Sequence, residues 1–94
     1  MIDTTALLAM PVNDRPQAEA FIAALHALNL GYHFDDGAVD CLHNNGLVPL
    51  NEAQQIDAKI DACYCAWRAS GANLQDDDPL GFLNELEEGT RDAS

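Results

Sequence analysis

The longest apolar pattern in the chain lies between Asn51 and Ser70 and constrains the fold more than any other feature. Asn51 and Gln54 are spaced to cap the start of a helix there, and Gly71 is placed to end it. Apolar residues recur at alternating spacings of three and four, the period of a packed helix: Ala53, Ile56, Ile60, Cys63 and Trp67. The pattern predicts a long helix whose apolar face belongs to the core of one chain. The alternative is a dimer seam formed by the last four of these residues in two copies.

A second helix is predicted to begin at Asp14, with Gln17 spaced three residues on to complete a reciprocal cap. Gly31 supplies a left-handed end for this helix. Its apolar stripe consists of Ala18, Phe21, Ile22, Leu25 and Leu28. A short helix over residues 4–10 is predicted to precede it, because Met10 stands before a proline.

The last predicted helix begins where Asp78 caps a chain that continues with Pro79. Its apolar face is formed by Leu80, Leu83 and Leu86, and Gly89 is placed to end it. Residues 90–94 are then predicted to be a frayed tail. Residues 1–94 are predicted to form one domain.

The segment between the second and the longest helix is predicted to be a β-hairpin. Tyr32–Phe34 and Ala38–Leu42 flank a three-residue turn whose third position is Gly37, as a bulged hairpin requires. Leu47–Val48 is a candidate third strand, restricted to an edge by Pro49. The predicted fold class is therefore α+β: a small, mostly helical domain with three to four helices and a short hairpin.

The charge balance excludes several classes of partner. The 94 residues contain 16 Asp and Glu but only 4 Lys and Arg, a net charge of −12. Direct binding to nucleic acid needs clustered cations, and an anionic membrane would repel this chain. No apolar run approaches the ~18 residues of a membrane span, and Asp3 stands where a signal peptide is basic. We therefore expect a cytoplasmic protein with reduced cysteines.

Metal binding and catalysis are weakly supported by the sequence. Four zinc-type ligands occur in two pairs, Cys41 with His43 and Cys63 with Cys65. Residues two apart on a helix point in different directions, so the second pair cannot readily hold one ion. A calcium loop counted from Asp76 lacks a side-chain oxygen at its fifth position. No signature surrounds any cysteine that would make it a nucleophile. The prediction is a protein without metal or cofactor that is not an enzyme.

The carboxylates gather in two patches that we interpret as partner-binding. One patch has six acids within thirteen residues: Asp76, Asp77, Asp78, Glu85, Glu87 and Glu88. The other surrounds the predicted hairpin: Asp35, Asp36 and Asp40. The first three acids suit the positive end of the last helix, whereas Glu87 and Glu88 are expected at its unfavourable negative end. Such an array can form charge-assisted hydrogen bonds with Arg and Lys of a basic protein surface.

In size, charge and carboxylate clustering, the chain resembles the DNA-mimic inhibitors of phages and mobile elements, the anti-restriction and anti-CRISPR proteins. The segment from Gly31 to Asp36 also resembles small accessory proteins of bacterial mobile elements. No functional residue carries over. The resemblance implies an inhibitor that occupies the nucleic-acid site of a nuclease or a CRISPR surveillance complex. The alternative is a small self-associating regulatory or structural domain, a homodimer through the seam, whose acidity only keeps it soluble.

Overall fold

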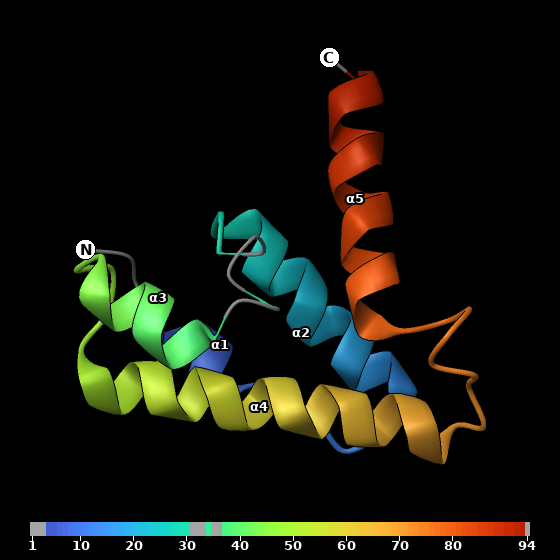
Figure 1. The fold of residues 1–94 in the computed structure, drawn as a ribbon, viewed down its shortest axis with the longest axis horizontal. Coiled ribbons are helices and arrows are strands. Elements are labelled where there is room, and N and C mark those ends of the chain that lie inside the picture. Colours follow the sequence, from blue (N-terminus) through green and yellow to red (C-terminus); the bar gives the residue numbers. More distant parts are fainter. Residues whose placement is uncertain (1–3, 31–33, 35–36, 94) are drawn as a thin grey trace.

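A computed structural model describes residues 4–30, 34 and 37–93, with side chains described as far as Gly89. Five helices form within these residues (Figure 1): α1 (Thr5–Ala9), α2 (Arg15–Ala27), α3 (Ala38–Asn44), α4 (Leu50–Ala69) and α5 (Pro79–Ala93). None of the described residues lies in a strand, so the predicted α+β class is wrong and the fold is all-helical.

Helix α4 is the base on which the other helices are arranged (Figure 1). Helix α3 packs along its N-terminal half, and α2 packs against both α4 and α5. Helix α5 stands upright beside the C-terminal half of α4, and its own C-terminal half projects away from the other helices. Helix α1 contacts α2 and α4, where the Thr4 hydroxyl donates to Glu52 Oε2 at 3.0 Å.

Helix α2 begins as the sequence predicts but ends earlier. The Asp14 carboxylate accepts from the Gln17 backbone N–H at 3.0 Å, while Gln17 Oε1 accepts from the N–H of Asn13 at 2.8 Å. The left-handed residue that ends the helix is Asn29, with φ of 62°, rather than Gly31. Asparagine tolerates this conformation, and the backbone N–H of Leu30 closes the motif on the Leu25 carbonyl.

The predicted hairpin is replaced by helix α3 where the structure describes it. Ala38 and Leu42 are buried four residues apart, on one helical face, while Asp40 between them is exposed. A strand would have placed all three side chains on the same face. Tyr32, His33, Asp35 and Asp36 of the predicted hairpin lie outside the described residues.

The predicted third strand is the C-terminal cap of α3. Gly46 adopts a φ of 70°, and the backbone N–H of Leu47 donates to the Leu42 carbonyl at 3.0 Å. Val48 is buried in the core, and no strand forms beside it among the described residues. Gly46 therefore ends α3, and Leu47–Val48 does not form a strand.

Helix α4 matches its predicted length but not its predicted start. It begins at Leu50 with Pro49 as the preceding residue, so Asn51 is inside the first turn and is not the cap. Gly71, with φ of 86°, ends the helix as predicted, and the Ala72 N–H closes the motif on the Trp67 carbonyl.

Helix α5 begins as predicted and continues further than predicted. Asp78 Oδ1 accepts from the Gly81 backbone N–H at 2.7 Å, which caps the helix before Pro79. A Cβ on Gly81 would lie only 2.8 Å from this oxygen, so the cap fits closely against glycine. The helix passes through Gly89 to Ala93, so the predicted end at Gly89 is wrong; the frayed tail stays a prediction.

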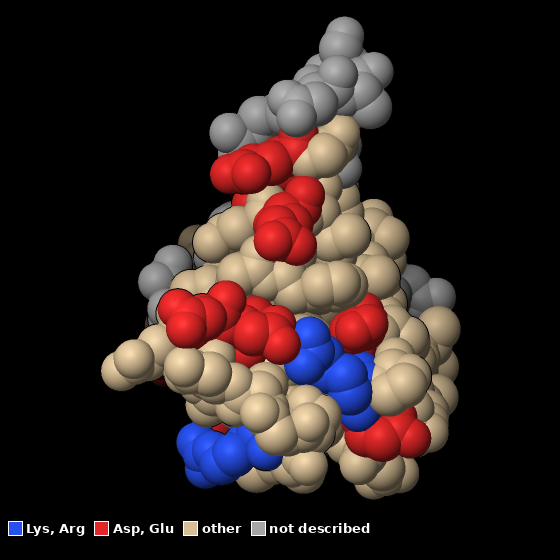
Figure 2. All heavy atoms as spheres, turned by 90° about the vertical axis from the view of Figure 1, so that its right-hand side faces the viewer, with Lys and Arg blue, Asp and Glu red and all other residues tan. Residues whose placement is uncertain are grey.

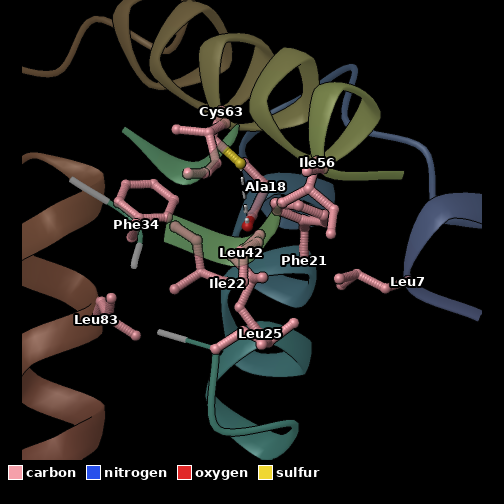
Figure 3. Packing of buried hydrophobic residues seen from close by; sticks show 14 of the residues in the cluster. Leu7, Ala18, Phe21, Ile22, Leu25, Phe34, Leu42, Ile56, Cys63 and Leu83 are labelled. Atoms are coloured by element: carbon pink, nitrogen blue, oxygen red, sulfur yellow. Dashed lines mark hydrogen bonds between the residues drawn. The ribbon is translucent and has the colours of Figure 1, made fainter. Parts of the chain in front are cut away.

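The core lies where α2 and α3 meet α4 (Figure 3). The apolar stripes predicted for α2 and α4 face each other there, and Leu83 contributes from α5. The largest side chains that are fully buried are Trp67, Phe21, Leu7, Ile22, Leu25, Leu30, Leu42, Ile56 and Leu83. No helix in the described part of the chain is long and apolar enough to cross a membrane.

Candidate interaction surface

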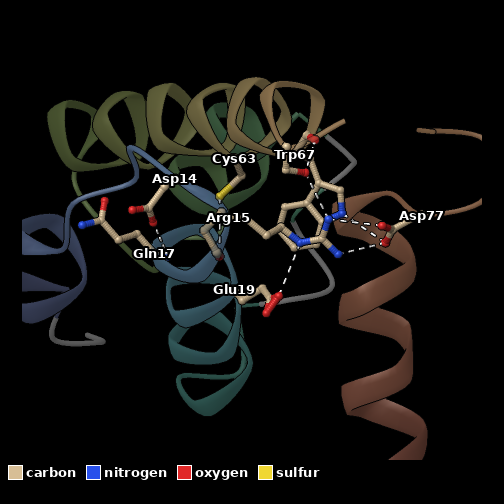
Figure 4. Close-up of polar contacts among 9 residues, drawn as sticks. Asp14, Arg15, Gln17, Glu19, Cys63, Trp67 and Asp77 are labelled. Carbon is tan, nitrogen blue, oxygen red and sulfur yellow. Dashed lines mark hydrogen bonds and ion pairs between the residues drawn. The ribbon is translucent and has the colours of Figure 1, made fainter. Parts of the chain in front are cut away.

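Arg15 joins α2, α4 and the loop before α5 through one side chain (Figure 4). Its guanidinium carbon lies 3.9 Å from the centre of the Trp67 ring. Nη1 and Nη2 donate to the two oxygens of Asp77 at 3.2 and 3.0 Å. Nε lies 3.4 Å from Glu19, an ion-pair distance without hydrogen-bond alignment. Because Trp67 also donates its indole N–H to Asp77 at 3.3 Å, the three groups form a closed triangle.

The electrostatics of this triangle favour an ionised Asp77. Hydrogen bonds from Arg15 and Trp67 and the positive charge of Arg15 lower the pKa of the carboxyl, although partial desolvation opposes them. Asp77 is nevertheless largely open to solvent, with a side chain 52% exposed. The ion pair is therefore accessible to salt and to competing charges.

The three consecutive aspartates each have a role within the chain. Asp77 pairs with Arg15, and Asp78 caps α5. Asp76 accepts a hydrogen bond from the Asn73 side-chain amide at 3.2 Å. This half of the predicted patch therefore builds the loop and the helix start as well as contributing charge.

The three predicted glutamates lie on α5 beyond the loop. Glu85 and Glu88 are exposed and three residues apart, so they are neighbours on one helical face, and Glu87 is partly exposed. No ion pair or hydrogen bond joins any of the three to another side chain in the part of the chain whose side chains are described. Figure 2 shows acidic groups in red on the upper, projecting part of the molecule. Lower down, further acidic groups lie on both sides of a basic group in blue.

The position of these glutamates along the helix corrects one argument from the sequence. Glu87 and Glu88 were expected at the negative end of α5, where carboxylates are unfavourable. Because α5 continues to Ala93, both lie more than a turn before its end, and the dipole effect falls off within the last turn. Their placement therefore needs no special explanation from the helix dipole.

A shallow hollow of about 140 Å³ lies between Arg15 and the start of α5. Its lining residues come from α2, the loop and α5: Arg15, Asp76, Asp77, Asp78, Gly81, Phe82 and Glu85. The hollow thus collects four carboxylates around one internal cation. It connects the aspartate loop to the first exposed glutamate of α5.

Asp40, the described residue of the second predicted patch, lies on a different helix from the first patch. Asp40 is exposed in the first turn of α3, where the helix dipole favours an acid. Helix α3 packs along the N-terminal half of α4, whereas α5 rises beside the C-terminal half (Figure 1). Asp35 and Asp36 lie outside the described residues.

The predicted dimer seam is inside the monomer. Ile56, Ile60, Cys63 and Trp67 are exposed by no more than 6% of their surface and pack against the rest of the core. A second copy could reach them only if the chain opened. The seam thus forms part of the core in this structure.

The cysteines do not form a site in the described structure. No group of three His, Cys, Asp or Glu side chains converges as a metal site among the described residues. Cys63 is buried, its thiol donates to the Ala18 carbonyl at 3.9 Å, and burial raises its pKa to about 12. Such a thiol is protonated and unreactive at neutral pH. Cys65, two residues on, is exposed, which fits the different directions expected on a helix.

Arg15 is the important residue that the sequence did not single out. Its partner Asp77 is 62 residues away, so no local spacing links the two. The sequence offered one indication, because basic residues are scarce: the chain has only 4 Lys and Arg. One of them, Arg15, directly follows the cap of α2.

No family model matches the chain, and comparisons with curated proteins and with solved structures give no match either.

Proposed function

We propose that this chain is a non-enzymatic protein that binds a basic protein surface through the carboxylates of α5. The partner's surface is one that normally binds nucleic acid, and the chain inhibits the partner by occupying that surface. This proposal extends the resemblance to DNA-mimic inhibitors, and it rests on the chemistry of one face of α5.

The carrying observation is the pair Glu85 and Glu88. Both side chains are exposed, lie on one face of α5, and lack an ion-pair partner among the described side chains. Like charges three residues apart weaken a helix by a few tenths of a kcal/mol. A basic partner would convert this repulsion into charge-assisted hydrogen bonds.

The setting of α5 supports the same function. Its C-terminal half projects from the other helices, so a partner can approach this part of the helix from several sides (Figure 1). A net charge of −12 on 94 residues would attract a cationic surface over a distance and speed association at low salt.

A pair of matched variants tests this proposal. Glu85→Gln with Glu88→Gln removes the carboxylates of α5, while Asp57→Asn with Asp61→Asn removes an i,i+4 pair from α4. Each double variant changes the net charge from −12 to −10, because each removes two acids. Tagged wild type and both variants are used to capture proteins from a bacterial lysate at low and high salt.

We expect the wild type and the α4 variant to capture the same nucleic-acid-binding protein, and DNA or RNA to displace it. The α5 variant should capture much less of it. Equal capture by all three proteins, or equal loss in both variants, would contradict a role for this face of α5. Capture that resists nucleic acid would contradict competition for a nucleic-acid site.

A further inference from the structure

Arg15 contacts Asp77 in the way that an arginine from another protein would. We call the aspartates 76–78 and the exposed glutamates of α5 the acidic surface. A guanidinium meets a carboxylate through two parallel N–H···O bonds, the geometry in which proteins recognise arginine. Its flat face lies on the indole ring of Trp67. The Arg15 side chain is 28% exposed, so this contact is open at its edge to solvent.

The surroundings of Arg15 are acidic. Carboxylates of Asp76, Asp78 and Glu85 line the same hollow, and Glu19 lies on the other side of the guanidinium. Arg15 thus contacts two acidic residues, Glu19 and Asp77, and shares the hollow with three more. A second cation arriving from outside would be attracted by the same charges and could take the same oxygens of Asp77.

We propose that Arg15 is an internal competitor for the cationic side chains of the partner, an autoinhibitory contact within the acidic surface. This inference rests on the proposed function and extends the binding surface from the glutamates of α5 to Asp77 in the loop before it. An arginine of the partner takes Asp77, and Arg15 leaves the carboxylate and the face of Trp67. Binding is weaker than it would be without Arg15, because the internal contact must first be broken.

Trp67 provides a direct signal of this exchange. It is the only tryptophan in the chain, it lies under the guanidinium, and it donates to the same carboxylate. Its fluorescence should therefore change when Arg15 moves. The reporter needs no label and is present in the natural sequence.

The experiment titrates the full chain with a nona-arginine peptide and measures the dissociation constant and the Trp67 emission. Arg15→Met removes the internal cation, and Arg68→Met, an exposed residue on α4, is the matched control. Both variants change the net charge from −12 to −13, since each loses one cation. Circular dichroism verifies that both variants remain helical.

We expect Arg15→Met to bind the peptide several-fold more tightly than Arg68→Met, and peptide binding to change Trp67 emission in the wild type. Arg15→Lys keeps the charge but loses the two-pronged geometry, so its affinity should fall between the wild type and Arg15→Met. If Arg15→Met and Arg68→Met bind the peptide equally tightly, or if the Trp67 emission does not change when the peptide binds, Arg15 is not an internal competitor.

Failure of the proposed function gives a different result. If the Glu85→Gln, Glu88→Gln variant binds the peptide as tightly as the wild type, the face of α5 is not the binding surface. If that variant no longer binds the peptide while Arg15→Met and Arg68→Met bind it equally tightly, the face of α5 is the binding surface. Only the competitor role of Arg15 is then wrong. If no form of the chain binds the peptide, both proposals are overturned.

Discussion

The helices α1 to α4 and the segment that follows α4 are held together by different forces. We call α1 to α4 the body, and residues 71–89, the loop and the described part of α5, the corner. In the body, apolar side chains from four helices are buried against one another. In the corner, Pro79 and Leu83 are fully buried and several partly buried apolar side chains pack beside them. Arg15 and the aspartates of the loop add an ion pair and hydrogen bonds to this packing.

This difference has a functional consequence. Apolar packing depends little on salt or on competing charges, so we expect the body to remain folded when a charged partner binds. Ion pairs and caps respond to salt, pH and competing cations, and the corner also carries the carboxylates that we assign to partner binding. We therefore expect the corner, rather than the body, to respond when a charged partner binds.

The largest expected effect is the loss of an aromatic ring from the body. Phe21 is completely buried, and Phe21→Ala should lower the free energy of unfolding by about 3–5 kcal/mol through lost transfer energy and a cavity. Phe82, a partly exposed phenylalanine of the corner whose ring lies 5.8 Å from that of Trp67, is the control. Phe82→Ala should cost less than half as much in a urea titration. Equal losses would contradict the distinction between body and corner.

A smaller effect is expected from the cap of α5. Asp78→Ala removes the carboxylate that accepts from the Gly81 N–H, and should lower the free energy of unfolding by about 1 kcal/mol. Asp76→Ala, in the same loop, loses only the bond from Asn73 and is the matched change in charge. Denaturant titrations compare the two, and an Asp76 variant as unstable as the Asp78 variant would refute a specific capping role.

The smallest effect should be a dependence on pH that belongs to Asp77. The pKa of this carboxyl is lowered in the folded chain, so its ion pair stabilises the fold above about pH 4, the pKa range of an unperturbed aspartate. The stabilisation should disappear as the pH falls through the lowered pKa. The difference in unfolding free energy between the wild type and Asp77→Asn should therefore shrink between pH 5 and 2, as measured by urea titration. A difference independent of pH would show that the charge of Asp77 does not stabilise the corner.

Features encoded by adjacent residues were predictable from the sequence. Asp14 and Asp78 cap helices because their spacing to a backbone N–H is local, and Gly71 ends α4 for the same reason. The buried stripes of α2 and α4 were predictable because each continues over several helical turns. A pattern of this length admits only one period.

Features that depend on short segments or distant partners were not predictable. Residues 38–42 are too few to distinguish a strand from a helix, and Ala38 and Leu42 fit both. Gly89 resembles a helix stop, but α5 continues through it. The pairing of Arg15 with Asp77 depends on how α2, α4 and the loop meet, which no local pattern records. The acidic patch was visible in the sequence, whereas the internal cation within it was not.

Hydrogen exchange by mass spectrometry on wild type, Arg15→Met and Arg68→Met tests most directly whether Arg15 holds the corner. We predict that Arg15→Met speeds amide exchange over residues 71–82, while exchange in the buried turns of α4 between Ile56 and Ala66 is unchanged. Arg68→Met should leave both regions as they are. Unchanged exchange over residues 71–82 in Arg15→Met, or an equal increase along the whole chain, would contradict a corner that is fastened by charge to an independently stable body.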